Sequence, residues 1–201
     1  MRPRVVVATR NPGKLVELTR LLALPAIELE ALDPAMPDVV EDGATFEANA
    51  IKKAREAALH TGEIAIGDDS GLEVDALGGA PGIRSARYSG LGARANVEKL
   101  LVALDGVRDA DRSARFRCVL AVVDPRAADA TLLVHGVCEG RIASAPCGDH
   151  GFGYDPVFIP LASDGRTMAE LDDDEKDALS HRGLACRALG SQLEAWLRAR
   201  A

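Results

Sequence analysis

The chain has 201 residues, of which 47% are hydrophobic, enough for one α/β domain with a substantial core. Its formal net charge of −7 argues against a broad surface for nucleic acid or anionic membranes, because both need clustered lysines and arginines. A single small anionic ligand remains compatible with this charge, since a metal ion and a few focused cations can bind it.

The four cysteines are Cys118, Cys138, Cys147 and Cys186, and they show neither C-x-x-C spacing nor a histidine at zinc-finger distance. The first apolar run, residues 5–8, is too short for the core of a signal peptide. No segment approaches the length of a membrane span. We therefore expect a cytoplasmic protein without disulfides.

Strand and helix signals alternate along the chain, which favours an α/β fold. A buried strand is predicted at residues 5–8, followed by a helix at 13–23 whose leucines recur on one face. A second strand is predicted at 27–32. A longer helix follows at 44–61, and Gly62 is expected to end it.

The same signals continue in the rest of the chain. A short apolar run at 64–66 indicates a strand, and residues 94–104 indicate a helix. Two long strands at 115–123 and 131–143 are expected to form an antiparallel hairpin, and a helix at 180–200 closes the chain. Two glycine-rich stretches are expected to be loops, at 78–82 and 144–156. The side chains expected to face inward on the last helix are Leu184, Ala188, Leu189, Leu193, Trp196 and Leu197.

Two adjacent carboxylates, Asp68 and Asp69, follow the apolar run at 64–66. Charges at the end of a buried strand are costly unless they are paired or bind a cation. Because neighbouring strand residues point to opposite faces, the two acids are not expected to share one site equally. One is then a metal ligand and the other orients the loop. The alternative is a turn in which Asp and Gly supply side-chain bonds and positive φ.

A strand also runs into a short loop and a helix start at residues 9–14. Backbone N–H groups at a helix N-terminus bind phosphate well, and Lys14 adds a charge. The loop is neither a Walker A motif nor a dinucleotide-binding fingerprint. The alternative is an ordinary strand–turn–helix junction, with Asn-Pro-Gly as the turn.

On the helix at 44–61, Asn49 and Lys53 are four residues apart and share a face, where they flank the apolar stripe. Glu41 and Asp42 lie just before this helix. They either favour its positive end or one of them completes a metal site with the acidic pair.

Two further segments carry candidate binding residues. The loop Gly151-Phe152-Gly153-Tyr154-Asp155-Pro156 places an aromatic ring between glycines, which suits stacking on a planar ligand; the alternative is that it closes the edge of a core. Ser180 is a good N-cap for the last helix. His181 and Arg182 then occupy the first turn, where cations oppose the helix dipole unless an anion or carbonyl-rich ligand binds there. A solvated pair is the alternative.

In this order, these pieces resemble the inosine/xanthosine triphosphate pyrophosphatase family, the Ham1-like non-canonical purine nucleotide pyrophosphatases. The resemblance covers nearly the whole chain. Two departures are Arg10, where many members carry Gly, and Glu47-Ala48 before Asn49. The matching segments are ATRNPGK, TFEANAIKKA, GDDSGLEVDALGGAPGIRSARYSG, RFRCVLAVV, GFGYDPVF and EKDALSHRG.

The resemblance implies one enzyme domain over residues 1–201, with a mixed central sheet of long strands flanked by helices and two lobes around a nucleotide-binding cleft. It implies a homodimer that hydrolyses ITP, dITP and XTP to the monophosphate and pyrophosphate with Mg²⁺. Asp69 is then the proton acceptor, and Asp69 and Glu41 bind the metal. The implied substrate-binding residues are Thr9, Arg10, Asn11, Pro12, Gly13, Lys14, Lys53, Ser70, Phe152, Gly153, Tyr154, Asp155, Lys176, His181 and Arg182.

Chemistry is consistent with these roles. A free aspartate has a pKa near about 3.9 and is a weak base, so Asp69 mainly needs to orient a metal-activated water. His181 and Arg182 can donate to the 6-oxo group of inosine and xanthosine, whereas adenine presents a 6-amino donor.

Two other functions remain open. A phosphatase with an aspartyl nucleophile usually needs a D-x-D arrangement after the first strand, where this chain has Thr9-Arg10-Asn11. The other alternative is a non-catalytic nucleotide-binding module, in which Asp69 would have little use.

Overall fold

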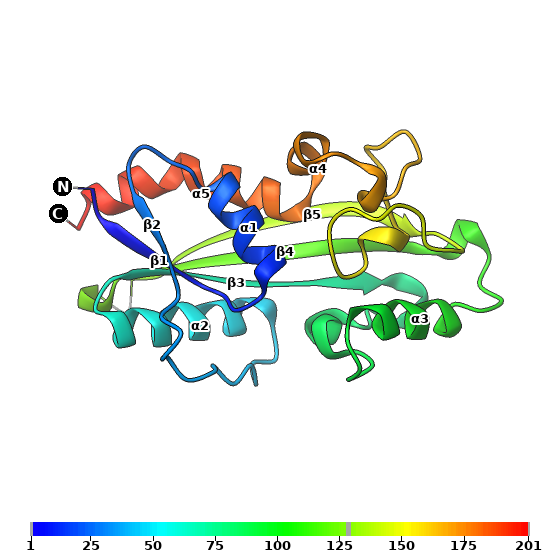
Figure 1. The fold of residues 1–201 in the computed structure, drawn as a ribbon, viewed down its shortest axis with the longest axis horizontal. Coiled ribbons are helices and arrows are strands. Elements are labelled where there is room, and N and C mark those ends of the chain that lie inside the picture. The colour runs from blue at the N-terminus through cyan, green and yellow to red at the C-terminus, as the bar shows by residue number, and fades with distance from the viewer. Residues whose placement is uncertain (1, 128–129, 201) are drawn as a thin grey trace. The chain divides into compact units, whose positions relative to one another are not determined.

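The computed structural model describes residues 2–127 and 130–200, and it is an α/β structure built on one six-stranded sheet in the order β2-β1-β3-β4-β5-β6 (Figure 1). The strands are β1 Arg4–Ala8, β2 Glu28–Ala31, β3 Ile64–Val74, β4 Ser113–Val123, β5 Leu132–Ile142 and β6 Phe158–Pro160. The helices are α1 Pro12–Leu21, α2 Phe46–Thr61, α3 Ala93–Ala103, α4 Asp173–Leu179 and α5 His181–Arg198.

The sheet is mixed, as expected. β1 pairs in parallel with β2 and β3, whereas β5 and β6 are antiparallel. β4 and β5 are neighbours, and only residues 124–131 connect them. A parallel crossover needs a dozen or more residues, so this connection gives the antiparallel hairpin predicted from the sequence. No helix in residues 2–127 and 130–200 combines the length and apolarity needed to cross a membrane.

The chain divides into two compact units, each with its own hydrophobic core. Unit 1 comprises Met1–Asp69, Cys118–Gly136 and Ala185–Ala201, and unit 2 comprises Ser70–Arg117 and Val137–Leu184. The long strands β3, β4 and β5 contribute residues to both units. Two units agree with the two lobes that the resemblance implies.

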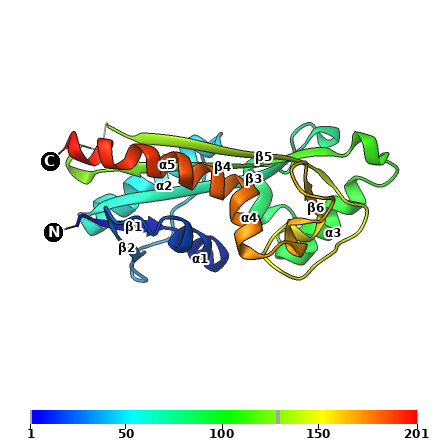
Figure 2. The same ribbon diagram turned by 90° about the horizontal axis from the view of Figure 1, so that it is seen from above.

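In unit 1, the two faces of the sheet are covered by different helices. Val5, Val7 and Ile66 pack in one core with residues of α1 and α5. The intervening positions of β3 face α2, where Gly67 lies against Ala50. Figure 1 shows α2 on one side of these strands and α1 and α5 on the other, and Figure 2 views the same ribbon from above. The alternation along β3 therefore decides which helix each side chain meets.

Unit 2 has a core in which α3 packs on its part of the sheet. Leu100 and Leu104 of α3 lie with Leu72 and Val74 of β3 and with Phe158 of β6. The loop that precedes β6 contributes to the same core, so the irregular segment predicted at 144–156 is anchored at its end.

The helix ends follow the sequence signals. Thr45 accepts a hydrogen bond from the Ala48 N–H at the start of α2, and Gly62 ends this helix in the left-handed conformation, as predicted. Ser180 accepts from the Gly183 N–H at 3.0 Å, which confirms its N-cap role for α5. One inward position is wrong: Leu184 is 37% exposed, and the neighbouring Ala185 is buried in its place.

The acidic pair does not mark the end of a strand. β3 continues from Ile64 to Val74, so Asp68 and Asp69 lie within it, and the predicted strand end and the alternative turn are both wrong. Both carboxylates are buried, and basic side chains from other segments pair with them. Because this pairing offsets the cost of buried charge, the strand can run through the acidic pair.

Candidate functional site

Asp68 and Asp69 point to opposite faces of β3, as the alternation of strand residues predicts. Asp68 forms an ion pair with Lys14 of α1, and Asp69 forms one with Lys53 of α2 at 3.0 Å. The sequence expectation that the two acids do not share one site equally is confirmed.

Asp69 is the centre of a polar cluster in unit 1. Its Oδ1 accepts from Lys53 Nζ at 3.0 Å, and its Oδ2 accepts from Asn49 Nδ2 at 3.2 Å. Lys53 also donates to Glu41 Oε1 at 2.7 Å. The expectation that Asn49 and Lys53 flank the apolar stripe is wrong, because both are buried against these carboxylate partners.

Burial and the neighbouring charges shift the pKa of each group in this cluster in opposite directions. Burial raises the pKa of Asp69, and the charges of Lys53 and Lys14 only partly oppose it. Burial alone would lower the pKa of Lys53, but the charges of Asp69, Asp68 and Glu41 outweigh it, so the pKa of Lys53 is raised. Asp69 is therefore a stronger base than a free aspartate, while Lys53 stays protonated.

Gly67 allows α2 to lie close enough for these contacts. A Cβ at this position would overlap the Ala50 carbonyl oxygen and come within 2.7 Å of the Ala54 backbone nitrogen. The missing side chain lets the turn of α2 from Ala50 to Ala54 rest on the strand, and this turn directly follows Asn49 and contains Lys53.

Replacing Gly67 with alanine is expected to destabilise the protein by about 1–3 kcal/mol, because backbone atoms cannot move aside as a flexible side chain would. The free energy of unfolding from urea titration measures this loss. Gly190→Ala is the matched control, since its Cβ would lie 3.5 Å from Leu24 Cδ2 in ordinary contact. That change sits within α5 and is expected to be neutral or stabilising. Equal stabilities for the two variants would contradict the close-approach argument.

On the opposite face, Asp68 links three segments of unit 1. Its Oδ1 pairs with Lys14 and its Oδ2 accepts from the Cys118 thiol at 3.2 Å. Asp68 and Cys118 are both almost fully buried, while Lys14 keeps some solvent access. The Cys118 thiol thus donates to the carboxylate that holds Lys14.

The loop before α1 is held by its own polar side chains. Asn11 caps the helix, with Oδ1 accepting from the Lys14 N–H at 3.2 Å, and Thr9 Oγ1 accepts from the Asn11 N–H at 3.2 Å. Pro12 occupies the first turn of α1, and Gly13 follows it. The helix N-terminus is therefore well formed at the position predicted to bind phosphate.

Arg10 has a different environment from the other predicted residues of this loop. Its Nε pairs with Asp38 Oδ1 at 2.7 Å, and its Nη2 donates to the Met36 carbonyl. This guanidinium therefore ties the loop to the segment before α2.

Glu41 and Asp69 fit the ligand preference of a hard divalent cation. Both carboxylates accept from Lys53 Nζ, so their oxygens converge on one point. No group of three or more His, Cys, Asp or Glu residues that could hold a metal is found in residues 2–127 and 130–200. Two carboxylates are sufficient for Mg²⁺, which keeps several waters and takes phosphate oxygens from its substrate.

The predicted residues of unit 2 form a second cluster around Asp155. Its Oδ2 accepts from Lys176 Nζ at 2.7 Å and from the Phe152 N–H at 2.8 Å. Lys176 Nζ lies 5.2 Å from the centre of the Phe152 ring. A Cβ on Gly151 would overlap Asp155, and the neighbouring Gly153 has a φ of 66°. The glycines thus allow the loop to wrap around a buried carboxylate.

The two aromatic residues of this loop have different environments. Phe152 is half-buried, whereas Tyr154 is buried in the core of unit 2 and donates from its hydroxyl to the Ser85 carbonyl at 3.0 Å. Tyr154 therefore closes the edge of the core, which is the alternative reading of this loop. Phe152 remains the aromatic residue suited to stacking.

Arg182 and His181 are buried at the start of α5 and are not a solvated pair. Arg182 Nη2 donates to Ser70 Oγ at 2.9 Å, and its guanidinium lies 5.7 Å from the centre of the Phe152 ring. The His181 ring stacks on Phe116, with 4.6 Å between ring centres and 10° between planes. Ser70, Arg182 and Phe152 are thus connected through direct contacts in unit 2, and His181 precedes Arg182 in the chain.

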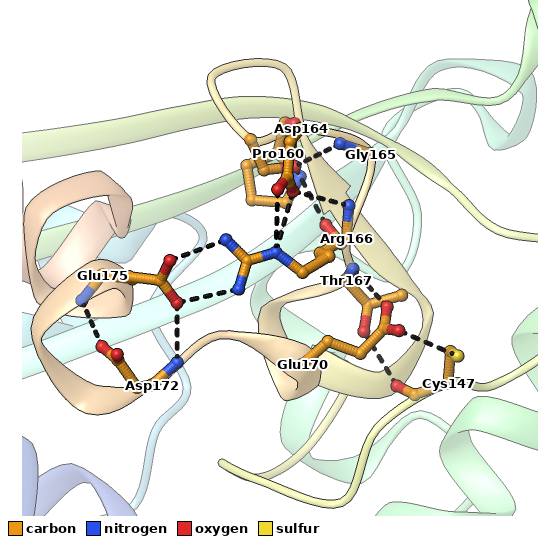
Figure 3. A network of polar contacts seen from close by, with 10 residues as sticks. Cys147, Pro160, Asp164, Gly165, Arg166, Thr167, Glu170, Asp172 and Glu175 are labelled. Atoms are coloured by element: carbon orange, nitrogen blue, oxygen red, sulfur yellow. Dashed lines mark hydrogen bonds and ion pairs between the residues drawn. The ribbon is translucent and has the colours of Figure 1, made fainter.

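A polar network fixes the short helix that carries Lys176. Arg166 donates to both carboxylate oxygens of Glu175, at 2.9 and 2.6 Å (Figure 3). Asp172 caps α4 by accepting from the Glu175 N–H, while Glu175 accepts in return from the Asp172 N–H. This reciprocal pair is a capping box. Because Glu175 directly precedes Lys176, the network sets the position of the lysine.

The same network includes the exposed thiol of Cys147. Cys147 Sγ donates to Glu170 Oε1 at 3.2 Å (Figure 3), and this bond raises the pKa of Cys147. Cys118, Cys138 and Cys186 are buried, and burial raises the pKa of Cys138 to about 12. A high pKa and burial both suppress thiolate reactivity.

Ellman's reagent is expected to label Cys147 first in the native protein, and more slowly than a free cysteine. Glu170→Gln should raise the labelling rate of Cys147 several-fold at about pH 7.5, because loss of the carboxylate charge lowers the pKa of the Cys147 thiol. The initial rate of absorbance change measures this, with melting temperature as a check on folding. An unchanged rate in the folded variant would contradict the role of Glu170.

One cavity in unit 1 lies away from these clusters. It has a volume of about 770 Å³ and is lined by residues that include Arg4, Arg126 and Ile64. None of the predicted site residues lines it. Among its arginines, Arg126 pairs with Asp124 at 2.9 Å, Arg198 with Glu194 at 2.7 Å and Arg4 with Glu63 at 3.7 Å. We therefore interpret it as a cluster of structural ion pairs.

Residue-by-residue prediction missed several contributors to the two clusters. The sequence singles out Asn49 without a partner, and it predicts no polar contact for Cys118. Phe116 was not recognised as the stacking partner of His181. Their partners lie far away in the sequence, so no local spacing signals the contacts. For Asn49, the available hint was a polar residue next to the apolar stripe of its helix.

Comparison with known proteins finds similar proteins over nearly the whole chain. The model of the Ham1 family matches residues 5–192. The dITP/XTP pyrophosphatase of Syntrophobacter fumaroxidans is 51% identical over 98% of this chain and 85% of its own length. The enzyme of the same name from Yersinia pestis is 50% identical over 92% of this chain and 95% of its own. A HAM1 protein from Coxiella burnetii has a TM-score of 0.87 and 44% identity, covering 97% of this chain and all of that one. With a family match over most of its length and relatives about half identical, the chain belongs to the Ham1 family.

Proposed function

We propose that this chain hydrolyses ITP, dITP and XTP to the monophosphate and pyrophosphate and so removes these nucleotides from the nucleotide pool. The observation that carries the proposal is the buried Asp69, held by Lys53 and Asn49 beside Glu41. A non-catalytic nucleotide-binding module would have no need of a buried carboxylate with a raised pKa. The names of the similar enzymes, dITP/XTP pyrophosphatase, support the same reaction.

We assign the phosphates to Lys14, Lys53 and the loop before α1. Lys14 supplies a positive charge at the start of α1, where backbone N–H groups favour anions. Lys53 supplies the second charge, and the raised pKa keeps it protonated at neutral pH. The loop residues proposed to contact the triphosphate with these lysines are Thr9, Arg10, Asn11, Pro12 and Gly13.

Asp69 is assigned as the proton acceptor. The oxygen of a water molecule adds to the α-phosphorus, the bond from that phosphorus to the oxygen bridging it to the β-phosphate breaks, and pyrophosphate leaves. One proton of that water passes to Asp69. Lys14 and Lys53 balance the charge that accumulates on the phosphate oxygens, which is usually a large contribution to catalysis. A divalent cation, held by Glu41 and Asp69, would supply Lewis-acid polarisation of the phosphate.

We assign the base to the residues around Phe152 and Arg182. Phe152 offers a half-buried ring for stacking, with Gly153, Tyr154, Asp155, Lys176 and Ser70 shaping the surroundings. His181 and Arg182 carry donors that match the 6-oxo group of hypoxanthine and xanthine. An adenine amino group would leave such donors unpaired, at a cost of about 1–3 kcal/mol each.

Three finer assignments complete the proposal. Mg²⁺ is the proposed cation, because two carboxylates plus substrate oxygens match its preference. The family resemblance supports a cytoplasmic homodimer that acts as one enzyme domain over residues 1–201. Neither nucleic acid nor a membrane surface is proposed as a partner, given the net charge of −7.

Product analysis tests the function directly. Incubation with ITP, followed by phosphorus NMR, is expected to show inosine monophosphate and pyrophosphate in equal amounts, and chelation of divalent cations should stop the reaction. Orthophosphate as the first product would instead indicate a phosphatase. Binding of ITP without turnover in the presence of Mg²⁺ would indicate a binding module. Either result would overturn the proposal.

A further inference from the structure

We infer that Asn49 is a positioning residue for the hydrolysis proposed above, which this inference presupposes. Its side-chain amide connects Asp69 on β3 with Gly43, which lies in the segment that carries Glu41. One buried amide thus holds the Asp69 carboxylate directly and the backbone two residues from Glu41.

The orientation of the amide follows from its partners. The Gly43 N–H can only donate, so the amide oxygen Oδ1 must face it, at 2.8 Å. The amide nitrogen Nδ2 then faces Asp69 Oδ2 at 3.2 Å and donates to it. A leucine of similar size could make neither bond, and an aspartate could make only the first.

The segment before α2 is shaped to receive this side chain. A Cβ on Gly43 would lie 2.5 Å from Asn49 Oδ1 and 2.9 Å from Ala48 Cβ. Only glycine therefore lets the backbone approach the amide closely enough for the hydrogen bond. Asn49 is 1% exposed, so water cannot substitute for either partner.

The hydrogen bond from Asn49 helps to fix the orientation of the Asp69 carboxylate. Asn49 holds Oδ2 while Lys53 holds Oδ1, so rotation of the carboxylate is opposed at both oxygens. Through Gly43, Asn49 also fixes the backbone two residues from Glu41, which accepts from the same lysine ammonium. Loss of the amide would let the two carboxylates shift relative to each other. Lys14 and the loop before α1 would keep their own contacts.

Steady-state kinetics with ITP tests this inference. Asn49→Leu is expected to lower kcat roughly ten- to a hundred-fold, the loss typical of one hydrogen bond to a charged group. KM should change by less than about three-fold, because the phosphate contacts remain. A folded Asn49→Leu with kcat within two-fold of wild type, or one that changes KM alone, would overturn the inference.

Two further variants keep the test decisive. Asn49→Asp retains the volume and the acceptor for Gly43 but cannot donate to Asp69, so its kcat should also fall at least ten-fold. If Asn49→Leu does not fold, this variant decides, and wild-type turnover in it overturns the inference. Lys52→Ala is the matched control, because Lys52 ties the same segment to α2 through Asp42 without touching Asp69. Its kcat should match wild type, and a loss equal to that of Asn49→Leu would overturn the specific role.

The outcome also separates this inference from the proposed function. If the wild-type protein does not release pyrophosphate from ITP, the proposed function fails and the role of Asn49 fails with it. If Asp69→Asn is fully active, the assignment of Asp69 as proton acceptor fails, and with it the role of Asn49. If Asp69→Asn is inactive while both Asn49 variants turn over normally, only the role of Asn49 is refuted.

Discussion

Asp69→Asn is expected to lower kcat for ITP hydrolysis by about a hundred- to ten-thousand-fold, the range typical of a lost general base. The amide keeps the shape of the side chain, but it removes the negative charge and the proton acceptor. Lys53 would also lose a buried ionic partner at 3.0 Å. Measurement of pyrophosphate release under saturating ITP and Mg²⁺ gives kcat directly.

The same substitution at Asp42 provides the control. Asp42 lies in the segment before α2 and pairs with Lys52, but its side chain is exposed. Asp42→Asn should keep wild-type kcat and melting temperature. Near-normal kcat in folded Asp69→Asn would refute the assignment of Asp69, whereas a collapse of melting temperature in that variant alone would point to a structural role.

The elements that local signals specify were predicted well. The apolar run of β1, the leucine face of α1 and the ends of α2 at Thr45 and Gly62 follow from spacing and capping chemistry. The shortest α-helix, α4, and the shortest strand, β6, were not predicted. The pattern Asp172-x-x-Glu175 is a capping-box signature that announces α4.

The acidic segment was misread because tertiary contacts override local preference. Glycine and aspartate favour turns, yet β3 continues through this segment. Gly67 is present to admit α2, and the charges of Asp68 and Asp69 are balanced by Lys14 and Lys53 from two different helices. None of these partners is close in sequence, so the spacing of residues could not reveal them.

The site could be predicted more fully by resemblance than by residue chemistry. Chemistry alone left Lys176 and Asp155 without a connection, and they form a buried pair 21 positions apart. The alternation rule did predict that Asp68 and Asp69 face different sides, because it depends only on strand geometry. The alternation rule could not predict which helix lies on each face of β3.

Arg182→Ala is expected to reduce the ratio of kcat/KM for ITP to kcat/KM for ATP by roughly ten- to a hundred-fold. The lost interaction is a charge-assisted donor to the 6-oxo group, worth about 1.5–3 kcal/mol. The change should arise mainly from a lower kcat/KM for ITP, since ATP offers no acceptor at that position. Measurement of kcat/KM for both nucleotides in wild type and variant gives the ratio.

The outcome separates base recognition by Arg182 from two other roles. If Arg182 binds phosphate, both nucleotides lose equally and the ratio stays fixed, which would refute the base-reading role. If it is only structural, the loss of its bond to Ser70 and its packing near Phe152 lowers the melting temperature without changing the ratio. Arg187→Ala, an exposed arginine on the same helix, is the matched control and should leave the ratio unchanged. A reduced ratio confined to Arg182→Ala would therefore assign this guanidinium to the 6-oxo group of the base.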